Sequence, residues 1–153
     1  MPLAKSGGRQ AVLGAARTLA ERDGLEALTL RRLAGELGIR APSLYKHFPD
    51  KAALLAVLAV ELSTELGRLL AVWSQERGGD LARLARGYRR FAQEHRHLLS
   101  LLVPTEDAVT AVATKAGNPE RALAFLAMAH GLSALGAADQ VWDAGTAAFE
   151  KRV

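Results

Sequence analysis

Between positions 29 and 51, hydroxyl and cationic side chains recur within a short stretch of the chain. Ser43 and Tyr45 carry hydroxyl groups, and Arg40, Lys46 and Lys51 carry positive charge. Hydroxyl, guanidinium and ammonium groups are the donors that proteins use to hold phosphate oxygens, and arginine also donates to guanine in the major groove. These residue types therefore favour contact with a polyanion such as DNA.

A second chemistry that the spacing allows is metal binding by Glu94 and His97, which form one Glu-x-x-His pair. Such a pair places a carboxylate and an imidazole on one helical face, as in di-metal bundles, but a bundle site needs a second copy. The chain has no second copy, and only Glu61 and Glu65 offer companion carboxylates. It also has no cysteine, no glycine-rich phosphate loop and no hydrolase or zinc-protease motif. We therefore expect no enzyme activity, no metal and no cofactor.

Positive charge is concentrated near the amino terminus of the 153-residue chain. Residues 1–51 carry nine Lys or Arg against five Asp or Glu, whereas residues 52–153 carry eleven of each sign, so the net charge of +4 lies in the first third. This suggests a polyanion partner, although a basic solvated face without a partner remains the alternative. No apolar run is long enough to span a membrane and no signal-peptide core is present, so we expect a cytoplasmic protein without membrane contact.

Nearly the whole chain is predicted to be helical, because Ala and Leu are abundant and no stretch alternates between polar and apolar residues. The expected helices span about residues 8–23, 30–37, 41–47, 51 to the Gly78-Gly79 break, 81–95, 98–102, 105–116, 119–136 and 140–153. Two of them, residues 30–37 and 41–47, are short and adjacent, which is typical of a helix-turn-helix unit.

The residues of this unit meet its geometric demands. Thr29 is a good N-cap, Ala34 is small where two helices must cross, and Gly38 accepts a left-handed turn without cost. A small core between the two helices is predicted from Leu33, Leu37, Ile39 and Leu44. A generic helical hairpin with a chance placement of Ala and Gly is the alternative.

Around this unit the sequence resembles the DNA-binding domain of the tetracycline-repressor (TetR) family. The resemblance covers about residues 9–56 and rests on the runs GLEALTLRRLA from Gly24, LGI from Leu37 and PSLYKHFPDKAALL from Pro42. The last run carries the specific pattern Leu-Tyr-x-His-Phe-x-x-Lys-x-x-Leu. The resemblance implies an all-helical, homodimeric transcriptional regulator, usually a repressor that a small molecule releases from DNA.

A recognition helix presents its first side chains to base edges, which places Arg40, Ala41 and Ser43 near the bases. The resemblance implies that Tyr45 donates to phosphate and that Arg31 contacts a base or a phosphate. The candidate DNA-binding residues are Thr29, Arg31, Arg40, Ala41, Ser43, Leu44, Tyr45, Lys46, His47 and Lys51. A merely solvated Arg40 and a core role for Tyr45 are alternatives, and Lys5 with Arg9 forms either a basic arm or a disordered end.

The remaining chain has weaker similarity to one subgroup of the family's ligand-binding domains, at Tyr88–His95 and Ala129–Leu132. We expect residues 1–50 to form the DNA-binding domain and residues 51–153 to form a helical effector-binding and dimerisation domain. The candidate dimer interface is Ala122, Phe125, Ala129, Leu132, Ser133 and Gly136, assisted by Trp142 and Phe149, with packing inside one chain as the alternative.

A ligand pocket is expected within this second domain, because apolar lining with a few polar groups is the usual composition of such sites. The candidate lining residues are Leu58, Leu62, Trp73, Tyr88, Phe91, Leu102, Phe125 and Met128, with His95 or His130 as polar groups. Plain core packing is the alternative for each. The sequence therefore predicts a homodimeric repressor of palindromic operator DNA, released by a small apolar effector. A helical interaction module without DNA binding is disfavoured by Arg40, Lys46 and Lys51.

Overall fold

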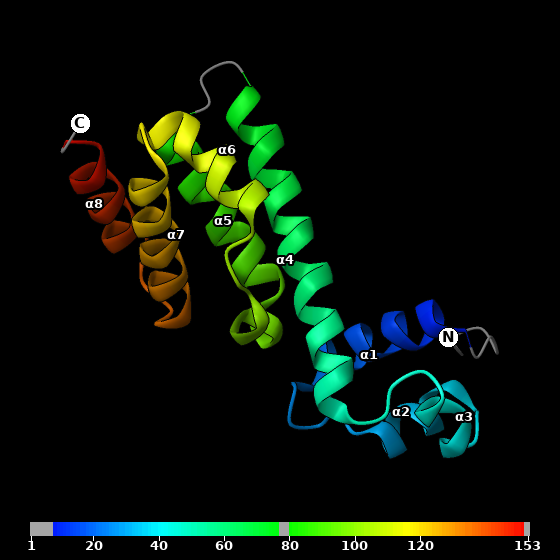
Figure 1. Cartoon of the computed structure of the whole chain (residues 1–153). Helices are drawn as coiled ribbons and strands as arrows, with labels where there is room; N and C mark the ends of the chain where they lie inside the picture. The colour runs from blue at the N-terminus through cyan, green and yellow to red at the C-terminus, as the bar shows by residue number, and fades with distance from the viewer. Residues whose placement is uncertain (1–7, 77–79, 152–153) are drawn as a thin grey trace. The chain divides into compact units, whose positions relative to one another are not determined.

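The computed structural model describes residues 8–76 and 80–151, and every regular element in these ranges is a helix (Figure 1). The elements are α1 (Arg9–Asp23), α2 (Leu30–Leu37), α3 (Ala41–Tyr45), α4 (Lys51–Gln75), α5 (Leu81–Glu94), the 3-10 helix η1 (Arg96–Leu101), α6 (Glu106–Ala116), α7 (Pro119–Ala134) and α8 (Asp139–Glu150). The expected all-helical fold is confirmed. None of these helices is both long and apolar enough to cross a membrane. Lys5 and the Gly78-Gly79 break lie outside the described residues.

The chain divides into two compact units. The first contains the described residues up to Val60 together with Arg96–Leu101, and the second contains Glu61–His95 and the residues from Leu102 onward. Helix α4 therefore contributes to both units. The division predicted at residue 50 stays a proposal.

In the first unit, α2 and α3 form the two short helices of a helix-turn-helix. Thr29 caps α2, because its side chain accepts the backbone N–H of Arg32 at 3.1 Å. Gly38 adopts the left-handed conformation with φ of 65°, which a residue with a Cβ adopts only at a cost. The N–H of Ile39 then donates to the Ala34 carbonyl at 3.0 Å and closes the helix. Local signals thus define this turn.

Several predicted helix ends are wrong by a few residues, among them those of α3 and α7. Helix α3 ends at Tyr45 instead of His47, because the N–H groups of His47 and Phe48 both donate to the Leu44 carbonyl, at 2.9 and 3.1 Å, and form a turn. That turn places the Phe48 ring in the core of the first unit. Helix α7 ends before Gly136, whose φ of 61° ends the helical path.

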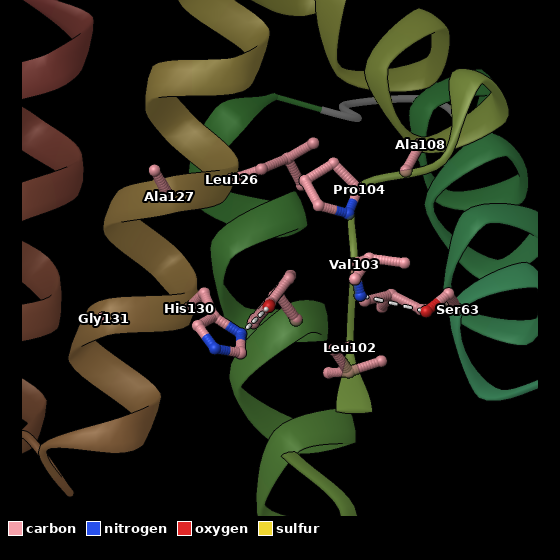
Figure 2. A pocket seen from close by; sticks show the side chains of 11 residues that line it. Ser63, Leu102, Val103, Pro104, Ala108, Leu126, Ala127, His130 and Gly131 are labelled. Atoms are coloured by element: carbon pink, nitrogen blue, oxygen red, sulfur yellow. Dashed lines mark hydrogen bonds between the residues drawn. The ribbon is translucent and has the colours of Figure 1, made fainter. Parts of the chain in front are cut away.

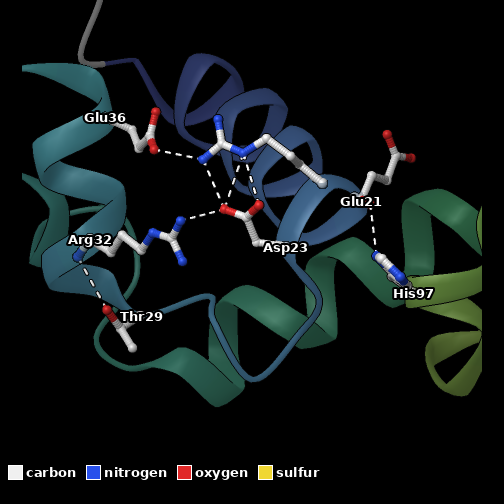
Figure 3. A network of polar contacts seen from close by, with 7 residues as sticks. Glu21, Asp23, Thr29, Arg32, Glu36 and His97 are labelled. Atoms are coloured by element: carbon white, nitrogen blue, oxygen red, sulfur yellow. Dashed lines mark hydrogen bonds and ion pairs between the residues drawn. The ribbon is translucent and has the colours of Figure 1, made fainter.

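A network of ion pairs joins the end of α1 to α2 (Figure 3). The Arg22 guanidinium lies 2.9 Å from the Asp23 carboxylate and 2.8 Å from that of Glu36. Arg32 of α2 also pairs with Asp23. The hydrogen bond from Arg22, with the charges of Arg22 and Arg32, holds the pKa of Asp23 below its usual value. Asp23 therefore links α1 to α2 in its ionised form.

We expect Asp23→Asn to lower the melting temperature at neutral pH and low salt. The folded-state pKa of Asp23 is lowered, so its stabilising contribution is present above the unfolded pKa and is lost as the pH falls through the folded pKa. The difference from wild type should therefore shrink in acid and in high salt. Thermal melts at two pH values and two salt concentrations test this, with the exposed Asp143→Asn as the control. A difference that persists unchanged in acid would contradict the ionic account.

The segment η1 belongs to the first unit although it follows α5 in the chain. His97 in η1 is hydrogen-bonded through Nδ1 to the Glu21 carbonyl of α1, at 2.8 Å (Figure 3). A carbonyl oxygen only accepts, so Nδ1 carries the proton. This carbonyl lies in the last turn of α1, where helix carbonyls lack intrahelical donors. His97 thus docks η1 onto the end of α1.

In the second unit, the remainder of α4 and helices α5–α8 enclose a shared core. Helix α7 packs against α5, α6 and α8, and α5 packs against α6 and α8. Asp80, Thr105 and Asn118 cap α5, α6 and α7, each by accepting a backbone N–H three residues later. Pro119 occupies the first turn of α7, where its missing N–H costs nothing. The caps therefore fix where each helix of this unit begins.

Candidate functional site

The predicted DNA-contacting residues lie on α2 and α3, at the positions that flank these two helices, and, for Lys51, at the start of α4. Arg31, Arg40, Ser43 and Lys46 are exposed, and the Tyr45 ring is 52% exposed. Thr29 is exposed with its oxygen engaged as the α2 cap, and Ala41, His47 and Lys51 are half-buried. Because α2 packs against α3, these side chains share one small part of the first unit.

Leu44 is the exception among these residues, because the prediction that it contacts DNA is wrong. Its side chain is 0% exposed and belongs to the core of the first unit. It sits in a five-residue helix whose neighbouring positions, Ser43 and Tyr45, point outward. Leu44 therefore supports the exposed residues without being able to touch a ligand itself.

On the helix-turn-helix, the side chains of Arg31, Arg40 and Lys46 have no ion pair or hydrogen bond with a described residue. Arg22 and Arg32, by contrast, are held in the network at the end of α1. Unpaired surface cations are ready to neutralise phosphates without first breaking a bond within the protein. Together with the exposed Tyr45 hydroxyl, they form a donor surface suited to a nucleic-acid backbone.

Two basic residues near this surface have structural partners. The Lys51 ammonium donates to the Leu25 carbonyl at 2.7 Å, which leaves two of its three N–H groups for other acceptors. Arg9 begins α1, donates to the His47 carbonyl at 2.9 Å and lies over the Phe48 ring, 4.5 Å from its centroid. A free basic arm at Arg9 is therefore wrong, because a cation–π contact and a hydrogen bond hold the side chain.

The second unit contains a pocket of about 300 Å³ (Figure 2). Apolar lining comes from Leu66 of α4, Ala108 of α6, Leu126 of α7 and the segment 102–104. Ala127 and Gly131 of α7 also line it. The volume is at the lower end of the range usual for small-molecule sites.

Three polar side chains line the same pocket. The Tyr88 hydroxyl and Nδ1 of His130 are hydrogen-bonded at 3.0 Å, and Ser63 Oγ accepts the Val103 N–H at 3.0 Å (Figure 2). Burial raises the pKa of Tyr88 well above its ordinary value, so its hydroxyl stays protonated at neutral pH. The pocket therefore combines an apolar wall with a few oriented hydrogen-bonding groups.

Of the predicted lining residues, the pocket contains Tyr88 and Leu102, and His130 is one of its polar groups. The others lie elsewhere. Leu62, Phe91 and Phe125 are buried in the core, and Leu58 lies in the first unit. Trp73 packs over Gly87, where a Cβ would approach its ring to 2.4 Å, and Met128 faces Gly145.

Ser63, Val103 and Gly131 were not predicted to line the pocket. One signal for the position of Val103 was present in the sequence, because Pro104 ends the preceding helix and leaves an irregular segment with free backbone groups. Ser63 and Gly131 carry no such signal, since both occur inside helices where small residues have many uses.

The predicted dimer interface on α7 also needs correction. Ala122, Phe125 and Ala129 are fully buried in their own chain, where α7 packs against α6. Leu132 and Ser133 are half-buried, and Gly136 is exposed. Of the predicted helpers, Trp142 is buried beneath Arg89, and Phe149 is half-buried against Phe125. The large apolar side chains that are exposed on α7, on α8 and at the end of α7 are Leu123, Val141 and Leu135.

Comparison with known proteins agrees with the geometry of the first unit. Residues 12–58 match the family model described as bacterial regulatory proteins, tetR family. The class D tetracycline repressor protein of Escherichia coli is 48% identical over 54 residues, which cover 35% of this chain and 25% of that protein. The chain thus spans about a quarter of the length of this curated relative.

Solved structures extend the likeness to nearly the whole chain. A protein of unknown function from Rhodococcus sp. RHA1 is 29% identical with a TM-score of 0.71, and the match covers 95% of this chain and 94% of that one. A TetR variant from Acinetobacter baumannii AYE, solved in complex with minocycline, is 27% identical with a TM-score of 0.62, over 91% and 89% of the two chains.

The matched residues 12–58 contain the helix-turn-helix and the exposed cations described above. The family consists of transcriptional regulators and not of enzymes, in agreement with the expectation from the sequence. The second unit lies within the part of the chain that these two solved structures match, so the likeness in fold extends over it. The first unit of this chain carries the helix-turn-helix domain of the tetR family of bacterial regulatory proteins.

Proposed function

We propose that this chain is a transcriptional repressor that binds palindromic operator DNA as a homodimer and is released by a small-molecule effector. The observation that carries the DNA-binding part is the set of unpaired cations Arg31, Arg40 and Lys46, beside the exposed Tyr45 hydroxyl, on a helix-turn-helix. Arg40 precedes α3 directly, where a side chain of a recognition helix reaches base edges.

Operator binding is tested by fluorescence anisotropy with duplexes from the DNA flanking the protein's own gene, against a scrambled duplex, at two salt concentrations. We expect one duplex to be preferred by about a thousandfold, with affinity that falls steeply as salt rises. Tyr45→Phe and Lys51→Ala should weaken binding to all duplexes alike, because phosphate contacts carry no sequence information. No binding at low salt would contradict the proposal.

The homodimer is proposed because one helix-turn-helix reads a short half-site, whereas two helix-turn-helix units about 34 Å apart read a palindrome. Apolar surface is exposed at Leu123 and Leu135 of the α7 region and at Val141 of α8, and the Leu135 side chain is 83% exposed. Burying such surface against a second copy is the usual way to remove it from water.

We expect Leu123→Glu with Val141→Glu to convert a dimer into a monomer, because two buried carboxylates per protomer would lack partners. Analytical ultracentrifugation measures the mass of each form. The control is Val72→Glu, which places the same charge at another exposed valine, on α4. A control variant that dissociates equally, or a wild type that is monomeric, would contradict this interface.

Effector release is proposed because the pocket and the DNA-binding unit are linked along the chain. Residues 102–104 line the pocket and follow directly on η1, which His97 docks onto α1 of the first unit. A ligand that changes the position of this segment acts on η1 and thereby on α1. A ligand that binds more tightly to one position of this segment than to the other then changes operator affinity by linkage.

A further inference from the structure

We propose that the pocket takes a compact, uncharged, largely hydrocarbon molecule with one hydrogen-bond-accepting oxygen, such as a ketone or an ester. This inference rests on the proposed function, since it describes the ligand of the same pocket. It is carried by the composition of the lining and by the hydrogen-bond donors that remain free in it.

The absence of charge among the described lining residues decides against an ionic ligand. Each of the residues that line the pocket is neutral or, for His130, hydrogen-bonded to a neutral hydroxyl. A carboxylate or an ammonium group brought into such a pocket loses its hydration and finds no opposite charge in exchange. The ligand that fits is therefore uncharged, and the pocket volume of about 300 Å³ requires it to be small.

Ser63 supplies the first free donor. Its side chain is 1% exposed, and its oxygen accepts the Val103 N–H at 3.0 Å. The hydroxyl makes no further hydrogen bond to a described residue, so its proton remains available. A buried hydroxyl proton without an acceptor is costly, and a ligand oxygen would satisfy it.

The Tyr88–His130 pair supplies the second donor. The Tyr88 hydroxyl and Nδ1 of His130 share one hydrogen bond, in which either group can be the donor. If the hydroxyl donates, the imidazole keeps a proton on Nε2, and if Nδ1 donates, the hydroxyl keeps its own proton, so the pair retains a free proton in either arrangement. Neither side chain has a further hydrogen bond to a described residue. Two free protons and no carboxylate in the described lining favour a ligand that accepts hydrogen bonds, which disfavours amines and favours carbonyl or ether oxygens.

Three probes of nearly the same shape test the proposal on the full-length protein without DNA: 4-phenylbutan-2-one, 3-phenylpropionate and butylbenzene. The first has an uncharged carbonyl, the second replaces the methyl group by a charged oxygen, and the third has no acceptor. We expect the ketone to bind about tenfold or more tightly than either of the others in calorimetry and thermal shift. Equal or tighter binding of the carboxylate, or no ketone binding at its solubility limit, would overturn the proposal.

Two variants locate the binding. Gly131 is helical and lines the pocket, and a Cβ added there meets no atom within 4 Å, so Gly131→Leu places a bulky side chain at the pocket wall without a clash at its Cβ. The matched control is Gly14→Leu on α1, where a Cβ also meets nothing within 4 Å. Gly131→Leu should abolish ketone binding and Gly14→Leu should preserve it. Ser63→Ala should reduce the preference for the ketone over butylbenzene to about twofold.

Ketone binding that survives in Gly131→Leu would overturn the assignment to this pocket. The readouts separate this inference from the proposed function. If the ketone binds but leaves operator affinity unchanged, the ligand class stands and effector release fails. If operator binding is specific while the carboxylate binds best, the regulator stands and the ligand class fails.

Discussion

Replacing Arg31, Arg40 and Lys46 together by alanine should weaken operator binding by about a thousandfold at physiological salt. Each of these cations is exposed and has no described partner, so it neutralises phosphate without giving up a bond inside the protein. The slope of log affinity against log salt should fall by about 0.9 for each phosphate that is no longer neutralised. Anisotropy titrations of wild type and variant across a range of salt concentrations measure both quantities.

The matched control removes the same charge from the second unit. Arg68, Arg86 and Lys115 are exposed and lie outside the helix-turn-helix. Their triple alanine variant should bind the operator like wild type and keep the wild-type salt slope. Circular dichroism confirms that both triple variants are folded. An equal loss of affinity in the two variants would assign the effect to net charge and would contradict a localised interface.

His97→Phe should leave operator binding and ligand binding intact but should nearly abolish the effect of one on the other. The substitution keeps an aromatic ring at this position but removes the hydrogen bond to the Glu21 carbonyl that docks η1 onto α1. Typical couplings between sites change affinity by about 5-fold to 150-fold. In the variant, the ratio of the operator affinities without and with ligand should fall toward one. The measurement is the operator dissociation constant with and without saturating 4-phenylbutan-2-one.

A conservative variant distinguishes coupling from folding. His97→Asn places an amide N–H near the position of Nδ1 and should keep much of the coupling, because the Glu21 carbonyl retains a donor. Comparable melting temperatures of the two variants would show that the weaker coupling in His97→Phe does not come from lower stability. Full coupling in His97→Phe would contradict a signal that passes through this hydrogen bond.

The helix-turn-helix could be predicted from the sequence because its signals are local. Thr29 and Gly38 each act within a few residues of their own position, as an N-cap and as a left-handed turn. The side chains that must face solvent for DNA contact are polar, and those that must be buried are apolar. Lys51 shows the limit of this reasoning, since its bond to the distant Leu25 carbonyl depends on tertiary packing.

The pocket and the dimer surface could not be predicted in the same way. Helix α7 carries small and apolar residues on all sides, so the three- to four-residue spacing of Ala122, Phe125 and Ala129 marks an apolar face without saying what covers it. In the structure these residues are buried within the second unit, where α7 packs against α5, α6 and α8. Trp73 likewise lies over Gly87, and nothing in the spacing of α4 indicates that contact.

The most direct test of the central claim is a DNase I footprint of the wild-type protein across the DNA that flanks its gene. We expect one protected segment that contains an inverted repeat with half-sites about one turn of the DNA helix apart, because the two identical helix-turn-helix units of a dimer read such a palindrome. The triple variant at Arg31, Arg40 and Lys46 should give no protection at the same concentration. Uniform protection of all sequences, or no protection by a wild-type protein that is shown to be folded, would contradict the account.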